Sequence, residues 1–125
     1  MVDASAALSG LLNDGPARQL LAVEQLHAPH LIDSEVASGL RRRVASRQVT
    51  ADSGWVALDT WRQLGLTRYA VYPVLERVWQ LRDNLSAYDA GYVALAEALD
   101  CSLVTADARL SHAPGMRCPV TVLPR

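Results

Sequence analysis

The sequence contains no lysine, and all twelve of its basic residues are arginine. Reaction mechanisms that depend on a catalytic lysine are therefore excluded. The formal net charge is -1, which by itself says little about binding partners. The two cysteines, Cys101 and Cys118, lack the CxxC spacing of a zinc or redox site, so we interpret both as structural residues.

Long apolar runs are also missing. No run approaches the ~20 residues that a membrane-spanning helix needs, and Asp3 interrupts the position where a signal peptide would carry its apolar segment. The sequence therefore predicts a cytoplasmic protein that does not enter a membrane.

Half of the 125 residues are apolar, which is enough for one domain with a core of its own, so we predict a single domain over residues 1–125. Helices are predicted over residues 4–12, 16–26, 31–47, 50–65, 74–81 and 89–100. Strands are predicted over residues 1–2, 68–72, 102–105 and 120–123, and a further one can lie within 27–30. This alternation predicts a three-layer α/β/α sandwich around a mainly parallel central sheet.

Some local details are also predicted. Asp33 or Ser34 is expected to cap the helix over residues 31–47. Within residues 50–65, the side chains expected to face inward are Val56, Leu58, Trp61 and Leu64. A first strand of only two residues is unusual, and it allows for a true start upstream of Met1.

Four acidic residues fall at the ends of predicted elements. Asp3 and Asp107 come immediately after strands, and Glu35 and Asp89 lie in the first turns of helices. Because ligands of open parallel sheets bind beyond the carboxyl ends of the strands, one crevice can collect all four acids. Each acid alone is also explained as a helix cap or by the helix dipole. Capping does not explain why all four positions carry a carboxylate.

A cluster of four ionised carboxylates needs compensating positive charge. Two like charges about 4 Å apart repel by about 4 kcal/mol at an effective dielectric constant of about 20. Hard oxygen ligands without His or Cys suit Mg²⁺ or Mn²⁺, and the chemistry that follows from such a site is phosphodiester hydrolysis.

The same residues resemble a known family. The stretches that carry the resemblance are VDASAAL, SEVASGLRR and above all YDAGYVALAEALDCSLVTADARL. They are similar to the PIN-domain ribonucleases, specifically the VapC-type toxins of bacterial toxin–antitoxin systems, and the resemblance covers essentially the whole chain. It implies a PIN-like fold and an endoribonuclease that uses Mg²⁺ or Mn²⁺. The catalytic, metal-binding acids that it implies are Asp3, Glu35, Asp89 and Asp107.

The resemblance implies further roles and partners. Ser5 and Thr105 match small hydroxyl residues that would orient carboxylates or waters. The implied partners are an RNA substrate, a second copy in a homodimer, and a VapB-like antitoxin that blocks the acidic groove. With RNA as the implied substrate, the candidates for phosphate binding are Arg42, Arg43, Arg41 and Arg47.

Glu35 lies at the margin of the apolar stripe of its helix, and Arg42 lies on nearly the same line ~10 Å further along the axis. Glu35 can therefore point into a pocket with Arg42 at its rim. The alternative is that Glu35 and the arginines only complement the two ends of the helix dipole.

Two other functions remain as alternatives. A PIN-like module that has lost catalysis would act by binding alone, although four retained acids argue against it. A phosphoacceptor receiver domain fits poorly, because Val2 stands where receivers have a second acid and the chain has no lysine.

Overall fold

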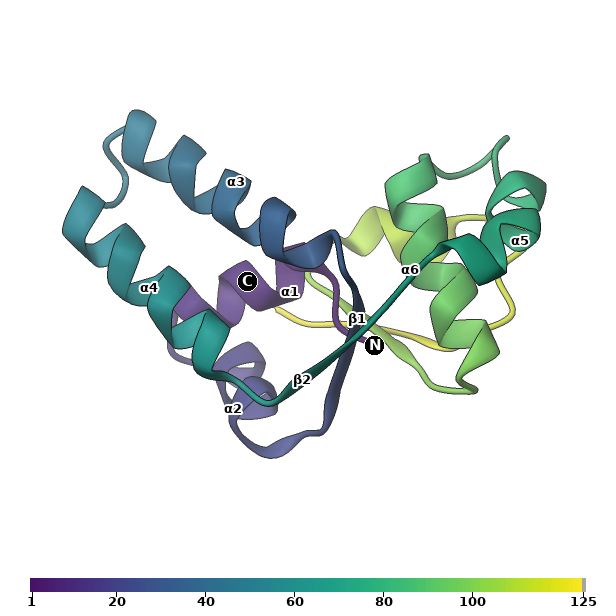
Figure 1. The fold of residues 1–125 in the computed structure, drawn as a ribbon, viewed down its shortest axis with the longest axis horizontal. Coiled ribbons are helices and arrows are strands. Elements are labelled where there is room, and N and C mark those ends of the chain that lie inside the picture. The colour runs from purple at the N-terminus through teal and green to yellow at the C-terminus, as the bar shows by residue number, and fades with distance from the viewer. Residues whose placement is uncertain (125) are drawn as a thin grey trace.

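The computed structural model describes residues 1–124. The α-helices are α1 (Ala4–Leu12), α2 (Pro16–Val23), α3 (Ile32–Ala45), α4 (Ala51–Gln63), α5 (Leu75–Gln80) and α6 (Ala87–Ala98). Two short 3-10 helices, η1 (Tyr72–Val74) and η2 (Ala108–His112), precede α5 and follow the third strand. Figure 1 shows the strands between two groups of helices, with α1 to α4 on one side and α5 and α6 on the other. This arrangement agrees with the predicted α/β/α sandwich.

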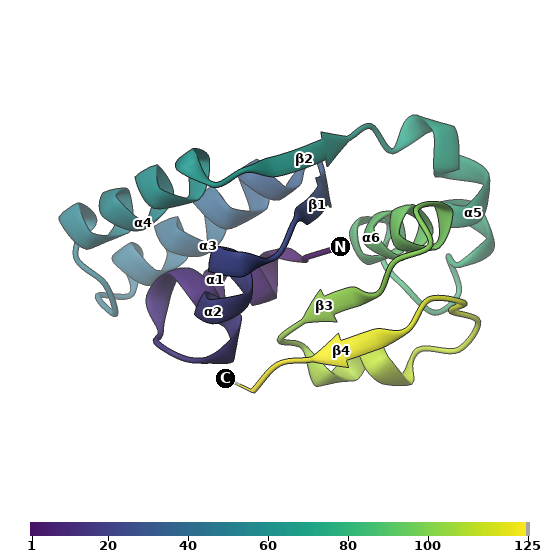
Figure 2. The same cartoon turned by 90° about the horizontal axis from the view of Figure 1, so that it is seen from below.

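The strands form two parallel pairs. They are β1 (Leu26–Pro29), β2 (Leu66–Tyr69), β3 (Leu103–Thr105) and β4 (Val120–Val122). Strand β1 pairs with β2, and β3 pairs with β4, both in parallel (Figure 2).

The first three residues join the two pairs. The N–H of Val2 donates to the carbonyl of His27 in β1 at 3.0 Å. On the other side, the N–H of Asp3 donates to the carbonyl of Val104 at 3.1 Å, and the N–H of Val104 donates to the carbonyl of Met1 at 2.8 Å. The short first strand predicted from the sequence therefore occupies the centre of the sheet, and Asp3 leaves the sheet from this central position.

Helix α6 is the most deeply buried helix of the core. Every residue from 90 to 96 is buried, as its nearly all-round apolar sequence predicts. It packs against β1 and β3, and its N-terminus is capped by Ser86, whose Oγ accepts from the N–H of Asp89 at 3.2 Å. Near the other end of α6, Glu97 pairs with Arg77 of α5 at 2.6 Å. The Ser86 cap and the packing on β1 and β3 thus position α6, whose first turn carries Asp89.

The predicted cap of α3 is wrong. The residue before the helix is Leu31, and neither Asp33 nor Ser34 provides a side-chain cap. The carboxylate of Asp33 instead binds Arg68 of β2 through two hydrogen bonds of 2.6 and 2.9 Å. It also accepts a hydrogen bond from Trp61 Nε1 at 2.8 Å. A tertiary contact between α3, α4 and β2 has therefore replaced the local one.

Other differences lie at element ends and on α4. Val56 is 62% exposed, so its predicted inward orientation is wrong, because α4 packs through the face that carries Ala57 and Trp61. Strand β2 begins at Leu66, two residues before the predicted start. Helix α2 ends at Val23, three residues before its predicted end, since the chain must extend to enter β1.

Within residues 1–124, no helix combines the length and the apolar character needed to cross a membrane.

Helices α1 and α2 approach each other closely at Gly10. A Cβ atom at this position would overlap Cδ1 of Leu21 and lie 3.0 Å from the carbonyl oxygen of Ala17. We predict that Gly10→Ala lowers the free energy of unfolding by about 1–3 kcal/mol, because overpacking outweighs the higher helix propensity of alanine. Urea denaturation followed by circular dichroism measures the change. In the control variant Gly65→Ala, the new Cβ meets no atom within 4 Å, so equal stabilities of the two variants would contradict the close approach.

Candidate active site

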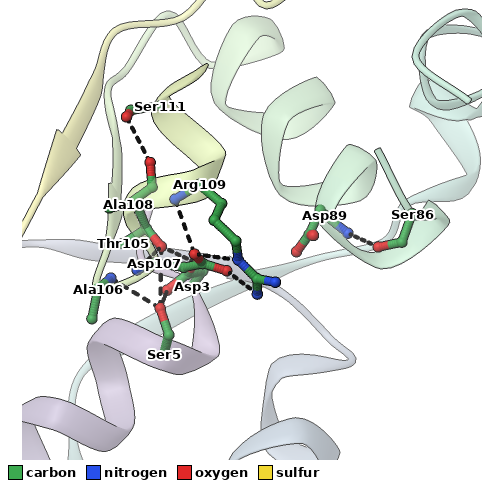
Figure 3. A network of polar contacts seen from close by, with 10 residues as sticks. All are labelled: Asp3, Ser5, Ser86, Asp89, Thr105, Ala106, Asp107, Ala108, Arg109 and Ser111. Atoms are coloured by element: carbon green, nitrogen blue, oxygen red, sulfur yellow. Dashed lines mark hydrogen bonds and ion pairs between the residues drawn. The ribbon is translucent and has the colours of Figure 1, made fainter. Parts of the chain in front are cut away.

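Asp3 is the buried anchor of the site. It is 6% exposed and caps α1, with Oδ1 accepting from the N–H of Ala6 at 2.9 Å and from Ser5 Oγ at 2.7 Å. Its Oδ2 accepts from Thr105 Oγ1 at 2.5 Å. Asp3 is thus both a helix cap and a link to β3, and the two predicted hydroxyl residues, Ser5 and Thr105, both donate to it (Figure 3).

Asp107 is connected to Asp3 through the same hydroxyl group. The N–H of Asp107 donates to Thr105 Oγ1 at 3.0 Å, while that hydroxyl donates to Asp3. Asp107 also caps η2, because its Oδ1 accepts from the N–H of Arg109 at 3.0 Å. The first and the last of the predicted acids are therefore held in place relative to each other.

Glu35 is half-buried in the first turn of α3. Its Oε1 accepts a hydrogen bond from the hydroxyl of Tyr92, on α6, at 3.0 Å. Burial is the main cause that raises the pKa of Glu35, and the negative charges of Asp89 and Asp3 raise it further against the effect of the Tyr92 hydrogen bond. The pKa of Tyr92 is itself raised by burial and by Glu35, so Tyr92 stays protonated as the donor.

Asp89 completes the set from the first turn of α6. Burial raises its pKa, and so do the charges of Asp3 and Asp107, whereas Ser86 and Arg109 lower it. The four acids thus influence one another electrostatically although they come from four different segments. We call Asp3, Glu35, Asp89 and Asp107 the carboxylate cluster.

The donor atoms of the carboxylate cluster fit a hard divalent cation. All are carboxylate oxygens. Burial is the main cause that raises the pKa values of Glu35 and Asp89, and the repulsion from neighbouring acids that adds to it is what a cation would relieve. The side chains do not form a ready-made cage, since within residues 1–124 no three His, Cys, Asp or Glu side chains are grouped closely enough to hold an ion. Instead Asp3 is engaged by hydroxyl groups, Glu35 by Tyr92 and Asp107 by Arg109.

A groove of about 610 Å³ is lined by Glu35 of the carboxylate cluster and by basic residues. We call it the α1–α3 groove, and its polar lining residues are Ser5, Ser9, Asn13, Glu35, Ser38, Arg42, Arg43 and Gln48. Glu35 and Arg42 share one hollow, as the helical spacing predicted. Arg41 lies in a different hollow, between α3 and α4, and Arg47 is exposed just beyond α3. The structure therefore brings two of the four candidate arginines to the groove.

The PIN domain family model matches residues 1–116. The chain belongs to the PIN-domain family. Ribonuclease VapC9 of Mycobacterium tuberculosis (strain H37Rv) is 62% identical over 125 residues, which cover 100% of this chain and 98% of VapC9. Ribonuclease VapC1 of the same strain is 42% identical over 128 residues, covering 98% of this chain and 96% of VapC1. These matches confirm the family resemblance inferred from the sequence.

A solved structure supports the fold independently. The crystal structure of PAE2754 from Pyrobaculum aerophilum superposes on this PIN domain with a TM-score of 0.70 at 20% sequence identity. The match covers 95% of this chain and 80% of PAE2754. It confirms the predicted fold class.

Two side chains of the site in this PIN domain are not among those predicted from the sequence. Tyr92 follows Asp89 by three residues, which places both on one side of α6, and a buried tyrosine hydroxyl needs a partner. The spacing therefore indicates from the sequence that Tyr92 lies on the same side of α6 as Asp89. Arg109 gives no comparable signal, because its contact with Asp107 depends on the tight turn at the start of η2.

The raised pKa of Glu35 predicts a pH-dependent cost in stability. The folded protein binds the proton of this carboxyl group more readily than the unfolded chain does, so ionised Glu35 destabilises the fold at neutral pH. This cost disappears below the ordinary pKa of glutamate, near pH 4. In metal-free protein, Glu35→Gln should raise the melting temperature by a few degrees at pH 7 and by nothing at pH 4, because glutamine keeps an acceptor for Tyr92.

Differential scanning fluorimetry with EDTA across this pH range measures the effect. The control is Glu24→Gln at an exposed position next to α2, which should leave the melting temperature unchanged. A lower melting temperature of Glu35→Gln at pH 7 would show that the Tyr92 contact, rather than the charge, dominates.

Proposed function

We propose that this PIN domain is an endoribonuclease that hydrolyses RNA phosphodiester bonds with Mg²⁺ or Mn²⁺. We also propose that it is the toxin of a toxin–antitoxin pair. The observation that carries the proposal is the carboxylate cluster, in which Thr105 connects Asp3 to Asp107 while the negative charge of Asp3 acts on both Glu35 and Asp89. The relatives named above as ribonucleases support the assignment to RNA.

In this proposal, Asp3, Glu35 and Asp89 hold the metal directly or through water, and Asp107 completes that site or a second one. When bound, the metal supplies an activated water and stabilises the leaving oxygen. The hydroxyl groups of Ser5 and Thr105 keep the Asp3 carboxylate in one orientation.

Glu35 is our candidate for the group that orients the attacking water and takes its proton. A general base works best when its pKa lies closer to the working pH than that of an ordinary carboxylate. Burial, the main cause that raises the pKa of Glu35, remains when a cation is bound, and the hydrogen bond from Tyr92 holds the carboxylate in place, so both support this role. Asp89, whose pKa is also raised, is the alternative.

The RNA backbone would follow the α1–α3 groove. Arg42 and Arg43 lie in the same groove as Glu35, so a phosphate bound by these arginines would belong to the strand that passes Glu35. The groove thus offers positive charge beside an acidic site that would otherwise repel RNA.

The proposed partners are a VapB-like antitoxin and a second copy of this chain. The VapC names of the relatives support the antitoxin, whose cationic side chain would neutralise the carboxylate cluster. Exposed aromatic side chains support a homodimer: Tyr72 is 77%, Trp79 68% and Tyr88 62% exposed. We place the activity in the cytoplasm, where such a toxin meets its RNA.

The decisive variant for catalysis is Asp89→Asn. We expect it to lower RNA cleavage in Mg²⁺ or Mn²⁺ more than about 100-fold, since even residues that only orient a metal ligand contribute 10- to 100-fold. Cleavage of a labelled RNA is measured with each metal and with EDTA. The control is Asp52→Asn, an acid in the first turn of α4.

Full activity of a folded Asp89→Asn protein would refute the assignment of Asp89. Undiminished cleavage in EDTA would refute the need for a metal. If the wild-type protein binds RNA but cleaves none under any metal condition, the inactive binding module becomes the better description.

Arg42→Gln tests the RNA path. In an Asp89→Asn background, which prevents cleavage, we expect weaker binding of single-stranded RNA and a salt dependence reduced by about 0.7 in the slope of log K against log [salt]. Fluorescence anisotropy at several salt concentrations measures both. Arg41→Gln removes the same charge from the neighbouring residue outside the groove. Equal losses in the two variants would contradict the proposed path.

A further inference from the structure

Arg109 forms a two-point ion pair with Asp107 at the edge of the carboxylate cluster. Its Nε donates to Oδ1 at 3.0 Å, and its Nη2 donates to Oδ2 at 2.9 Å. The backbone N–H of Arg109 also donates to Oδ1, because Arg109 is the second residue of the helix that Asp107 caps. One residue therefore engages both oxygens of this carboxylate.

The same guanidinium also acts on Asp89, which lies on another element. Figure 3 shows the guanidinium of Arg109 on the side of Asp107 that is turned toward the Asp89 carboxylate. Burial and the charges of Asp3 and Asp107 raise the pKa of Asp89, whereas the charge of Arg109 lowers it. Arg109 therefore offsets negative charge on both η2 and α6.

Arg109 lies at the surface of the protein. Its side chain is 91% exposed, and the side chain of Asp107 is 29% exposed. In the pair between Arg77 and Glu97, by contrast, the side chains are 18% and 12% exposed. An exposed ion pair contributes little to stability, so Arg109 can leave Asp107 at small cost while Arg77 is part of the framework.

We propose that Arg109 is the resident counterion of the carboxylate cluster in the metal-free protein and releases Asp107 when a divalent cation binds. The inference rests on the metal-dependent function proposed above. A cation needs the carboxylate oxygens that the guanidinium occupies, and the two positive charges repel each other, so they compete for Asp107. Arg109 is then a positioning residue that stabilises the empty cluster and lowers its affinity for metal.

The test is Mn²⁺ binding, measured by isothermal titration calorimetry on chelator-treated protein. We expect Arg109→Gln to bind Mn²⁺ about two- to fivefold more tightly than the wild type, a range set by the modest strength of exposed ion pairs. Arg109→Lys, which keeps the charge without the two-point contact, should lie between them. The control is Arg62→Gln, which removes the same charge from an exposed pair with Asp59 outside the cluster.

A second measurement separates competition from a structural role. Without metal, Arg109→Gln should melt at a lower temperature than the wild type, because the cluster has lost its counterion. With saturating Mn²⁺ this difference should close. A residue needed only to shape the site would instead weaken Mn²⁺ binding when replaced.

Unchanged or weaker Mn²⁺ binding by Arg109→Gln, with normal binding by the wild type, would overturn the role of Arg109 and leave the ribonuclease proposal intact. The same gain in Arg62→Gln as in Arg109→Gln would also overturn it, because net charge alone would then explain the effect. If the wild type binds no Mn²⁺, both proposals fail.

Discussion

The hydroxyl group of Thr105 joins parts of the chain that are about a hundred residues apart in sequence. It donates to Asp3, which follows the central segment of the sheet, and accepts from the N–H of Asp107, which follows β3. Its position is fixed because β3 lies directly beside residues 1–3. The rest of the site is built around this link, with α3 and α6 adding Glu35 and Asp89 from the helices that cover the sheet.

The same arrangement brings negative charges close together, which has an electrostatic cost in the folded state. Burial and neighbouring negative charge raise the pKa values of Glu35 and Asp89, so the folded state holds two acids in surroundings that disfavour their ionised forms. Three of the four acids have a local partner that stabilises the carboxylate: hydroxyl groups for Asp3, Tyr92 for Glu35 and Arg109 for Asp107. A bound cation would take over this task, which links occupancy of the site to stability.

Much of the fold could be predicted because it depends on local patterns. The all-round apolar sequence of α6 predicted its burial, and the positions of Asp3 and Asp107 directly after strands predicted that these two acids lie close together. The predictions that are wrong are those in which a tertiary contact replaced the local interaction expected from the sequence. Asp33 binds Arg68 and Trp61 instead of capping α3, and Val56 faces solvent because α4 packs through a different stripe.

The sequence by itself determined the family and the α/β/α class, because residue type and order carry these properties, and it singled out the four acids as candidates. Only the tertiary structure decided how the acids are held and which arginines accompany them. Arg41 and Arg42 are neighbours in sequence, yet the rotation of about 100° per residue along a helix sends them to different hollows. The roles of Tyr92 and Arg109 likewise depend on distances across segments, which packing sets and sequence order does not express.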